Sequence, residues 1–344
     1  MARDVASRAV AQRVRLADVA AASHVSIATA SRALAGSGNV SRAAVTAVLA
    51  AAERLGYRPD PIARAMRSRQ TGLVGIVIPG VANPFFAEVI EALENAMQTR
   101  GLDMLLADSR GSVVEESRRL EMLLDRKVDG MFVIPSDEHA SALAIRGAQR
   151  YVPVVQIDRR VDGVAGDYVG IDNACGIRAL LEHLATQGCR RVAFVSDRGL
   201  SSTGRRRLEA FRSEVRRAAG IRAMRPVLGT FSAEFGREAA VRLLRQRPLP
   251  DAVVCGADVV ALGVLKELHA QRVAIPDDIL VSGFDGISFA ELCDPPLTTV
   301  RQPVEAIASE AVGLLWSRLN DDRSAPRHHE IAPILEVRRS SSCA

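Results

Sequence analysis

The chain has 344 residues, 48% of them hydrophobic but only 4% aromatic, which is enough to bury two or three aliphatic cores. No apolar run reaches membrane-spanning length and the charged N-terminal stretch has no apolar leader, so we expect a cytoplasmic protein without membrane contact. Five scattered cysteines without C-x-x-C spacing predict reduced thiols and no cysteine-built metal site.

Positive charge is concentrated near the N-terminus. Residues 1–70 hold 11 arginines and four acidic residues, a net charge of +7, while the whole chain carries +5. The remainder is therefore mildly acidic. A basic segment on an acidic body indicates an anionic partner for that segment, such as nucleic acid.

Three short helices are predicted from about residue 14 onward. Leu16, Val19 and Ala20 repeat with helical spacing. Ser26 is a good N-cap for a second helix over 27–34. A third helix is expected over 42–55; Ser41 would cap its start, and Gly56 would end it.

The second of these helices has two distinct faces. Ala30 and Ala33 share the inner face, where small side chains allow close packing on the first helix. The outer arc consists of Ile27, Ala28, Ser31 and Arg32. Three helices with a tight first turn predict a helix-turn-helix whose second helix can enter a DNA major groove. A small helical cap or an oligomerisation arm is the alternative.

Residues 58–71 are predicted to be a linker. Asp60 can cap, and Pro61 suits, the first turn of a short helix over 61–67, which is too short to be stable alone. It would expose Met66 between arginines. A flexible basic tether is the alternative.

From residue 72 the chain alternates between apolar strand-like runs and amphipathic helices, with a break near 160–173. This pattern predicts an α/β fold of two doubly wound parallel subdomains with ligand-competent crevices at the strands' carboxyl ends. The expected strands are 73–79, 102–107, 129–135, 152–158, 167–172, 190–196, 251–258, 279–285 and 331–337, and segment 298–302 is expected to cross back between the subdomains. The expected helices are 84–99, 113–127, 138–149, 173–187, 204–219, 233–246, 259–271 and 303–319.

No catalytic or cofactor signature is present. The sequence has no G-x-G-x-x-G, no G-x-x-x-x-G-K-[ST] and no H-E-x-x-H, so we expect no cofactor and no enzymatic activity. His328 and His329 form a lone pair in an expected polar loop, which indicates solvated side chains rather than metal ligands.

Several motifs occur in one order along the chain: LADVA, VSIATASRAL, GYRPDPIARAM, NPFFAEVI, VDGMFVIP, GFDG and PPLTTVRQP. Together they resemble the LacI/GalR (lactose repressor) family of bacterial transcription regulators, from about Val14 to the end of the chain. The resemblance implies a DNA-binding head, a hinge helix and a two-lobed core like that of periplasmic sugar-binding proteins. Residues 1–13 lie outside it and are expected to be disordered.

The resemblance also assigns roles to residues of the head. It implies that Ile27, Ala28 and Arg32 face base edges, while Ser26, Thr29 and Ser31 serve phosphates or cap the helix. Met66 would wedge into the minor groove once paired hinge helices fold on DNA. The expected DNA-binding residues are thus Ser26, Ile27, Ala28, Thr29, Ser31, Arg32 and Met66. The sequence departs from the family where Ser23-His24 replaces Ala-Gly and where Ala35 replaces Asn.

Matching positions in the core imply an effector site between the lobes. Its expected residues are Phe85, Phe86, Asp158, Ser201, Thr203, Arg207, Phe231 and Asp285. Charged groups for hydroxyls and aromatic faces for rings suit a sugar or sugar derivative. Asp258 is interpreted as a helix N-cap, and Ala257 stands where sugar-responsive members often have Asn.

The predicted organisation is a 1–13 extension, a 14–58 helix-turn-helix domain, a 59–71 hinge and a 72–344 core. Within the core the expected lobes are about 72–160 plus 300–328 and about 161–298 plus 329–344. The predicted function is a dimeric repressor of palindromic operator DNA, controlled by a small effector. A solute-binding protein or an α/β enzyme with an unrelated helical head is the alternative.

Overall fold

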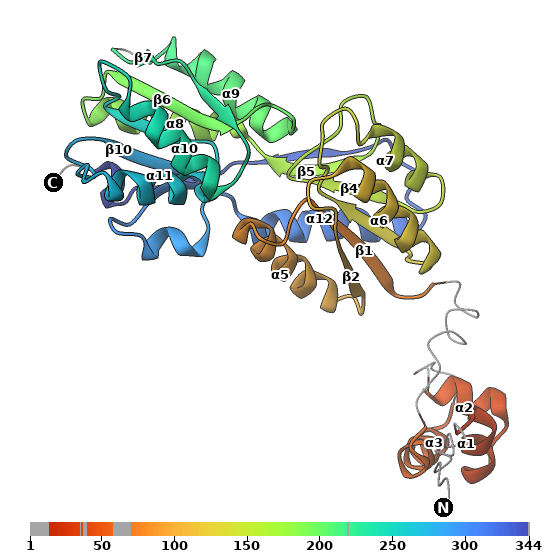
Figure 1. Ribbon diagram of the computed structural model, residues 1–344. Helices are drawn as coiled ribbons and strands as arrows, with labels where there is room; N and C mark the ends of the chain where they lie inside the picture. Colours follow the sequence, from red (N-terminus) through yellow and green to blue (C-terminus); the bar gives the residue numbers. More distant parts are fainter. Residues whose placement is uncertain (1–13, 35, 37–39, 58–69, 219, 343–344) are drawn as a thin grey trace, which may run out of the picture. The chain divides into compact units, whose positions relative to one another are not determined.

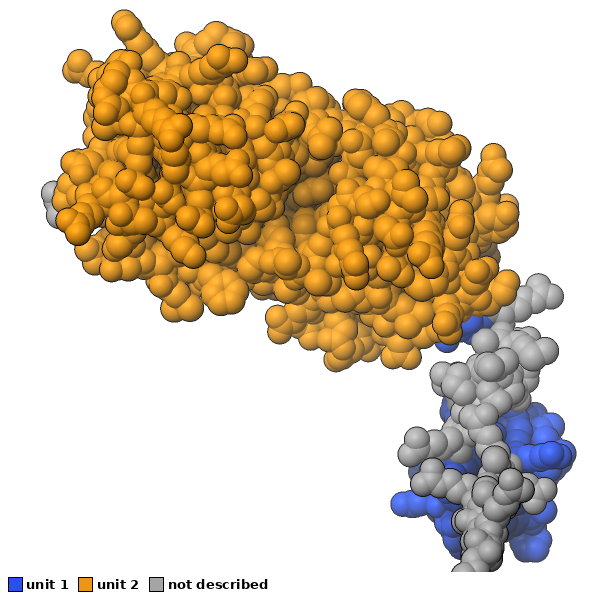
Figure 2. Space-filling view, in the orientation of Figure 1, with its two compact units in different colours: residues 1–71 blue, residues 72–344 orange. Residues whose placement is uncertain are grey.

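The computed structural model describes residues 14–34, 36, 40–57, 70–218 and 220–342. It divides into two compact units, Met1–Thr71 and Gly72–Ala344, which Figure 2 shows in separate colours and Figure 1 shows as ribbons. The first is called the head and the second the core. Met66 and the expected hinge helix lie outside the described residues.

Three helices form the head: α1 (Leu16–Ala22), α2 (Ile27–Leu34) and α3 (Arg42–Leu55). Their shared core is built from small aliphatic side chains, Val19, Ala20, Ala30, Ala33, Val48, Ala51 and Ala52. The Ser26 hydroxyl accepts from the amide of Thr29 at 3.1 Å, and Ser41 caps α3 by accepting from Ala44 at 3.3 Å. Gly56 ends α3 in a left-handed conformation, as its position after the apolar repeat predicts.

The turn between α1 and α2 accommodates its unusual residues by backbone conformation. His24 has a φ of 52°, in the left-handed region that favours glycine. Ser23 is buried, and its hydroxyl donates to the carbonyl of Val19 at 2.7 Å. The turn therefore keeps the tight geometry of a helix-turn-helix even though a Cβ is present at His24.

A parallel sheet with strand order β12-β5-β4-β3-β1-β2 forms the first lobe of the core. Helix α5 packs with α12 and α6 packs with α7. A Cβ on Gly75 of β1 would meet Leu123 of α6, and one on Gly130 of β3 would meet Leu315 of α12, so the pairs cover opposite faces. The bounds are β1 (Leu73–Ile78), α5 (Pro84–Gln98), β2 (Asp103–Asp108), α6 (Val113–Asp125), β3 (Gly130–Val133), α7 (Ala142–Gln149), β4 (Val154–Ile157), β5 (Asp167–Ile171), α12 (Val304–Leu319) and β12 (His328–Ile331).

The second lobe has strand order β13-β11-β10-β9-β6-β7, with β8 also paired to β6. Only β13 runs antiparallel to its neighbour among these described strands. Helix α8 packs with α9 and α10 packs with α11 (Figure 1). The bounds are α8 (Asn173–Thr186), β6 (Arg191–Asp197), α9 (Ser202–Val215), β7 (Arg222–Ala223), β8 (Val227–Gly229), α10 (Ala233–Leu244), β9 (Ala252–Cys255), α11 (Asp258–Ala270), β10 (Leu280–Asp285), η1 (Ser288–Leu292), β11 (Thr298–Arg301), β13 (Ile334–Glu336) and η2 (Arg339–Ser341).

The chain passes between the lobes at places that differ from the expected ones. Strand β5 belongs to the first sheet, so the first crossing follows Ile171 rather than residue 160. Strand β11 belongs to the second sheet, although the first lobe was expected to resume at residue 300. The expected strand 331–337 divides between two strands in two sheets, β12 and β13. Pro333 lies between them in sequence, and its missing N–H does not favour a continuous strand.

None of the described helices is both long and apolar enough to cross a membrane. His328 and His329 lie in β12 rather than in a loop. His328 Nε2 lies 3.1 Å from the carbonyl of Gly166, and His329 Nδ1 lies 2.5 Å from Glu310. Within the described ranges no group of three potential ligands gathers to hold a metal ion.

Candidate functional site

Helix α2 exposes the arc that the sequence predicts. Ser26, Ile27, Ala28 and Arg32 are exposed, Ile27 to 56%, whereas Thr29 and Ser31 are half-buried. The Ser26 and Thr29 hydroxyls are 2.8 Å apart and close the first turn. Arg32 Nε donates to the carbonyl of Ala28 at 3.2 Å. The helix thus presents an apolar side chain and a guanidinium on one surface.

In the core, Arg207 is the centre of a buried polar group between the lobes. It is 2% exposed, and its Nε donates to Asn173 Oδ1 at 2.8 Å. Its Nη1 donates to the Gly256 carbonyl at 2.7 Å and to Asp285 Oδ1 at 2.9 Å. The guanidinium also lies 3.8 Å from the ring centroid of Phe284. These contacts fix it in one orientation.

Asp285 receives a second donor from the other side. Gln302 Nε2 donates to the same Oδ1 at 2.9 Å. Burial raises the pKa of Asp285 to about 6; Asp158 adds to the increase, and Arg207 and Gln302 oppose it. The backbone of Asp285 has a φ of 116°, a strained conformation for a non-glycine residue, which is typical of functional sites.

Asp158 and Arg159 complete this group from the first lobe, at the end of β4. Asp158 has a φ of 60° and is 5% exposed. Burial raises its pKa, and Arg207 and Arg159 oppose the rise. Arg159 Nε lies 3.7 Å from Asp158 Oδ2, beyond hydrogen-bond distance, and Arg159 Nη1 donates to the Pro135 carbonyl at 3.4 Å. We call the six residues the interlobe cluster: Asp158, Arg159, Asn173, Arg207, Asp285 and Gln302.

Three polar atoms of the interlobe cluster are buried without a hydrogen-bond partner among the described residues. They are Asp158 Oδ1, Arg159 Nε and Gln302 Oε1. Buried polar groups in folded proteins are almost always bonded, so unsatisfied atoms at one place indicate a missing partner. Two acceptors and one donor suit a ligand that carries several hydroxyls. Figure 2 shows the surface hollowed between the two halves of the core.

The expected aromatic residues divide between site and core. Phe86 and Phe231 both lie near the Arg159 guanidinium, with ring centroids 5.5 and 5.9 Å from it. Phe231 comes from the second lobe, just before α10, and is half-buried. Phe85 and Phe86 are 2% and 4% exposed and both belong to the main hydrophobic core, but of the two only Phe86 lies against the Arg159 guanidinium. Phe85 therefore supports the site from within the core.

Ser201 and Thr203 begin the helix that carries Arg207. The Ser201 hydroxyl caps α9 by accepting from Gly204 at 3.1 Å and donates to Asp197 Oδ2 at 2.7 Å. The Thr203 hydroxyl lies 3.3 Å from that of Ser201. Gly204 leaves room for Asp197, because a Cβ there would come 1.6 Å from its carboxylate. Both hydroxyls are thus engaged in holding the start of α9.

The interpretation of Asp258 as a helix N-cap is wrong. Ala257 is the N-cap, and Asp258 is the first residue of α11. Its carboxylate accepts from the amides of Gly286 and Ile287 at 2.7 and 2.9 Å and from the Thr299 hydroxyl at 2.6 Å. Asp258 therefore fixes the loop that follows Asp285. Burial raises its pKa to about 8.

Arg159, Asn173 and Gln302 were not among the expected site residues. Two signals could have found them. Asn173 and Arg159 directly follow the ends of predicted strands, where α/β folds bind ligands. Gln302 lies within the PPLTTVRQP motif and directly follows strand β11 of the structure.

Comparisons with known proteins agree with this architecture. The family model for bacterial regulatory proteins of the lacI family matches residues 15–60, and the model for a periplasmic binding protein-like domain matches residues 181–341. The ribose operon repressor of Halalkalibacterium halodurans is 32% identical over 330 residues, covering 94% of this chain and 96% of that protein. The transcriptional repressor PurR of Photobacterium profundum is 30% identical over 325 residues, covering 94% and 97%.

Solved structures share the fold. A lac repressor dimer bound to operator and the anti-inducer ONPF matches with a TM-score of 0.87 at 23% identity, covering 96% of this chain and all of that one. The transcriptional regulator CelR in complex with cellobiose matches with a TM-score of 0.72 at 32% identity, covering 95% and 100%. The assignment follows from three findings: a helix-turn-helix head, a two-lobed core, and repressors as relatives along nearly the whole chain. The chain belongs to the lacI family of bacterial transcription regulators.

Proposed function

We propose that the chain is a dimeric repressor of palindromic operator DNA, acting in the cytoplasm and performing no catalysis. A small sugar or sugar derivative in the interlobe cluster would control its affinity for the operator. One observation carries the proposal. The same chain has an exposed helix, α2, which we call the reading helix, and a buried cluster with three unsatisfied polar atoms. Relatives named as ribose operon repressors and a CelR–cellobiose complex support the choice of a sugar.

In the head, we assign direct reading of bases to Ile27, Ala28 and Arg32. Ile27 and Ala28 have no side-chain hydrogen-bonding groups, so they would contact apolar features such as thymine methyl groups. Arg32 can bind guanine through two hydrogen bonds. Ser26, Thr29 and Ser31 would contribute through phosphates or through the helix cap.

In the hinge, we assign the minor-groove wedge to Met66. Inserted apolar side chains kink DNA and matter most where the sequence permits the kink. Met66→Ala should therefore weaken binding to the operator more than binding to random DNA, measured by fluorescence anisotropy on both duplexes. Equal losses on the two DNAs would remove the wedge from the proposal.

A dimer is supported by apolar side chains at one edge of the first lobe. Strand β2 is the edge strand of its sheet, and Leu106 on it is 47% exposed. Val81 and Val114, which follow β1 and open α6, are 54% and 77% exposed. Sedimentation equilibrium of the full chain tests the oligomer. Leu106→Glu with Val114→Glu should yield monomers, while Leu143→Glu on α7 serves as a matched exposed control.

The function itself is tested by selecting binding sites for the full chain from random duplex DNA. A palindrome should emerge, and a panel of free sugars that includes D-ribose and cellobiose should then contain a member that changes its affinity. Arg207→Met should keep the selected DNA sequence but lose the response. A chain that binds sugars but selects no DNA sequence would instead be a solute-binding protein, and turnover of a sugar would identify an enzyme.

A further inference from the structure

Helix α9 carries three consecutive arginines that reach three different partners. Arg207 bonds to the interlobe cluster, as described above. Arg206 Nη1 donates to Glu330 of β12 at 2.6 Å. Arg205 bonds to Glu138, in the loop between β3 and α7. Successive residues of a helix point about 100° apart. One turn of α9 therefore contacts the interlobe cluster through Arg207 and the first lobe through both Arg205 and Arg206.

The contact between Arg205 and Glu138 has the geometry of a strong ion pair. Arg205 Nε donates to Glu138 Oε2 at 2.7 Å, and Nη2 donates to Oε1. The Glu138 side chain is 1% exposed, whereas that of Arg205 is 34% exposed. The amide of Glu138 also donates to the Leu200 carbonyl at 2.8 Å. Two parallel charge-assisted bonds fix both distance and orientation between the lobes.

Other contacts around this pair join the same two lobes. The amide of Arg160 donates to the Ser202 hydroxyl at 3.0 Å, and Asp162 lies 3.7 Å from Arg205. Away from the start of α9, the amide of Ser288 donates to Glu88 at 2.8 Å, a contact in which only one partner is charged. Lobe contacts that involve side-chain charge on both partners are therefore concentrated at the start of α9.

Because Glu138 is buried, its carboxylate depends on Arg205 to compensate its charge. A carboxylate removed from water is tolerated only when an opposite charge and hydrogen bonds compensate it. In the closed core Arg205 supplies that compensation from the other lobe. Without Arg205, separation of the lobes would let water reach Glu138, so the closed arrangement would lose population to an open one.

We propose that the Glu138–Arg205 pair is a clasp that holds the two lobes closed before any effector binds. The clasp is made by the protein alone, so it sets the closed fraction of the free chain and, through it, the affinity of the interlobe site. Both are positioning residues. Arg205 also donates to Glu209 of its own helix at 3.0 Å and lies near Asp162, but its described contacts and those of Glu138 do not include the interlobe cluster. This inference goes beyond the proposed function, because it concerns the chain without effector or DNA.

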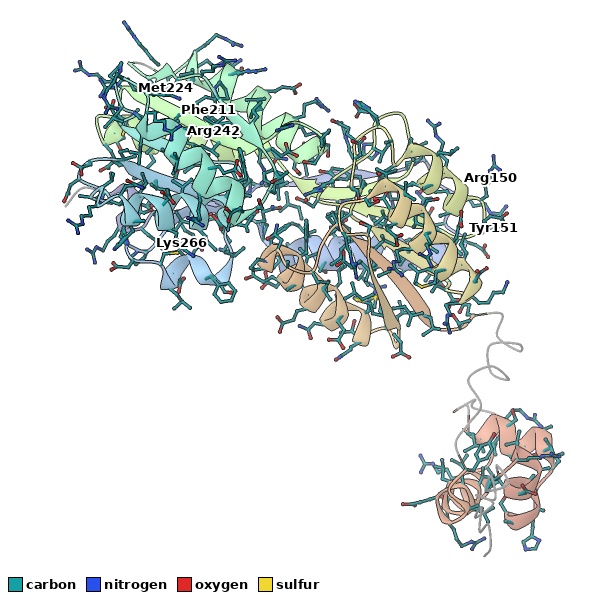
Figure 3. The ribbon with its side chains drawn as sticks, in the orientation of Figure 1. Arg150, Tyr151, Phe211, Met224, Arg242 and Lys266 are labelled. Atoms are coloured by element: carbon teal, nitrogen blue, oxygen red, sulfur yellow. The ribbon has the colours of Figure 1, made fainter. Side chains whose placement is uncertain are left out.

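The test measures the distance between the lobes directly. Spin labels are placed at Tyr151→Cys, after α7 in the first lobe, and at Lys266→Cys, on α11 in the second; both side chains lie on the surface (Figure 3). The five native cysteines are replaced by alanine or serine, and labelled chain is diluted with unlabelled chain to remove distances between protomers. Pulsed electron resonance then gives the distance distribution in full-length protein without sugar.

Glu138→Gln and Arg205→Gln should each move the distribution to longer distances by more than the width of the parent peak. The double variant should move it no further than Arg205→Gln alone, because that variant has already lost the contacts with both Glu138 and Asp162. Arg205→Lys, which keeps the charge but loses the fork, should give an intermediate shift. Unchanged distributions in both single variants would overturn the proposal.

A matched pair within one lobe provides the control. Arg242 and Glu238 form an exposed i,i+4 pair on α10, each side chain 55% exposed (Figure 3). Arg242→Gln should leave the distance distribution unchanged. An equal shift in Arg242→Gln would show that loss of any ion pair loosens the core and would also overturn the clasp. Retained cooperative unfolding in each variant establishes that the compared chains are folded.

Discussion

Helix α2 of the head and helix α9 of the core each present an arginine where a ligand is expected, but their surroundings differ. Arg32 is exposed and its Nε bonds to the backbone of its own helix. Arg207 is buried, and side chains and a carbonyl from three other elements hold it. Arg32 is therefore accessible at the surface, whereas Arg207 is enclosed by partners that the core itself supplies.

In the head, the arginine is expected to matter for DNA binding but not for stability. In the core, the arginine is expected to matter for both ligand binding and stability. Removing an exposed arginine leaves no buried charge behind, so the head should lose specificity without losing stability. Removing a buried arginine leaves a carboxylate without its counter-charge, so the core should lose both. The two helices therefore make opposite predictions for the same kind of substitution.

The largest expected effect is that of Arg207→Met. It leaves Asn173 Oδ1 without its donor and Asp285 without its counter-charge, with Gln302 still donating to Asp285, and should lower the free energy of unfolding of the core by about 3–5 kcal/mol. Urea unfolding followed by circular dichroism measures the loss. Arg212→Met on the exposed side of α9 should change it by less than about 0.5 kcal/mol. Similar effects for the two variants would break the comparison.

The next effect concerns pH. Because burial raises the pKa of Asp285 from its ordinary 3.8 to about 6, the folded chain holds more protons than the unfolded chain between those values. Stability should therefore fall as pH rises from 4 to 6, by up to about 3 kcal/mol from this group. Asp285→Asn should flatten that part of the profile in urea unfolding. An identical slope in parent and variant would contradict the assignment.

A smaller and purely functional effect is expected in the head. Arg32→Ala should reduce discrimination at one base pair of each half-site by about 1–3 kcal/mol while leaving the melting temperature unchanged. Competition binding with singly substituted operators measures the discrimination. If affinity falls equally for every sequence, Arg32 contacts only phosphate, and the head reads bases through other residues.

The smallest effect tests the backbone of the head. His24 has a left-handed conformation that costs an L-residue about 1 kcal/mol. Glycine avoids this cost, but its unfolded chain is more flexible and loses more entropy on folding, which offsets part of the gain. His24→Gly should therefore stabilise the head by about 0.5 kcal/mol. Calorimetry of the full chain would show this as a higher temperature for the unfolding transition of the head. Unaltered base preference in this variant would confirm that the turn supports the reading helix without itself reading DNA.

Much of the head follows from local chemistry and was predicted from it. Ser26, Ser41 and Gly56 mark helix ends by hydrogen bonding and backbone freedom, which neighbouring residues alone decide. The outer arc of α2 follows from helical spacing in the same way. The left-handed His24 was expected only as a departure that the turn had to tolerate.

The core was predictable in class and less so in its crossings. Alternating strands and helices predicted the parallel sheets. Residues 158–166 join β4 to β5 without a helix, and β5, although its residues were predicted correctly, was assigned to the wrong lobe. Among site residues, Arg207 and Asp285 came from the family resemblance. The role of Asp258 was missed because its partners, Gly286, Ile287 and Thr299, are distant in sequence and only folding brings them together.

The central claim is that the interlobe cluster and the reading helix are coupled in one molecule. The full chain is titrated with its selected palindrome in the presence and absence of a sugar that the panel identifies, and with that sugar in the presence and absence of the palindrome. Linkage requires the sugar to change the Kd for DNA by the same factor by which DNA changes the Kd for sugar. Equal factors different from one are predicted; a sugar that binds while leaving the DNA affinity unchanged would contradict the account.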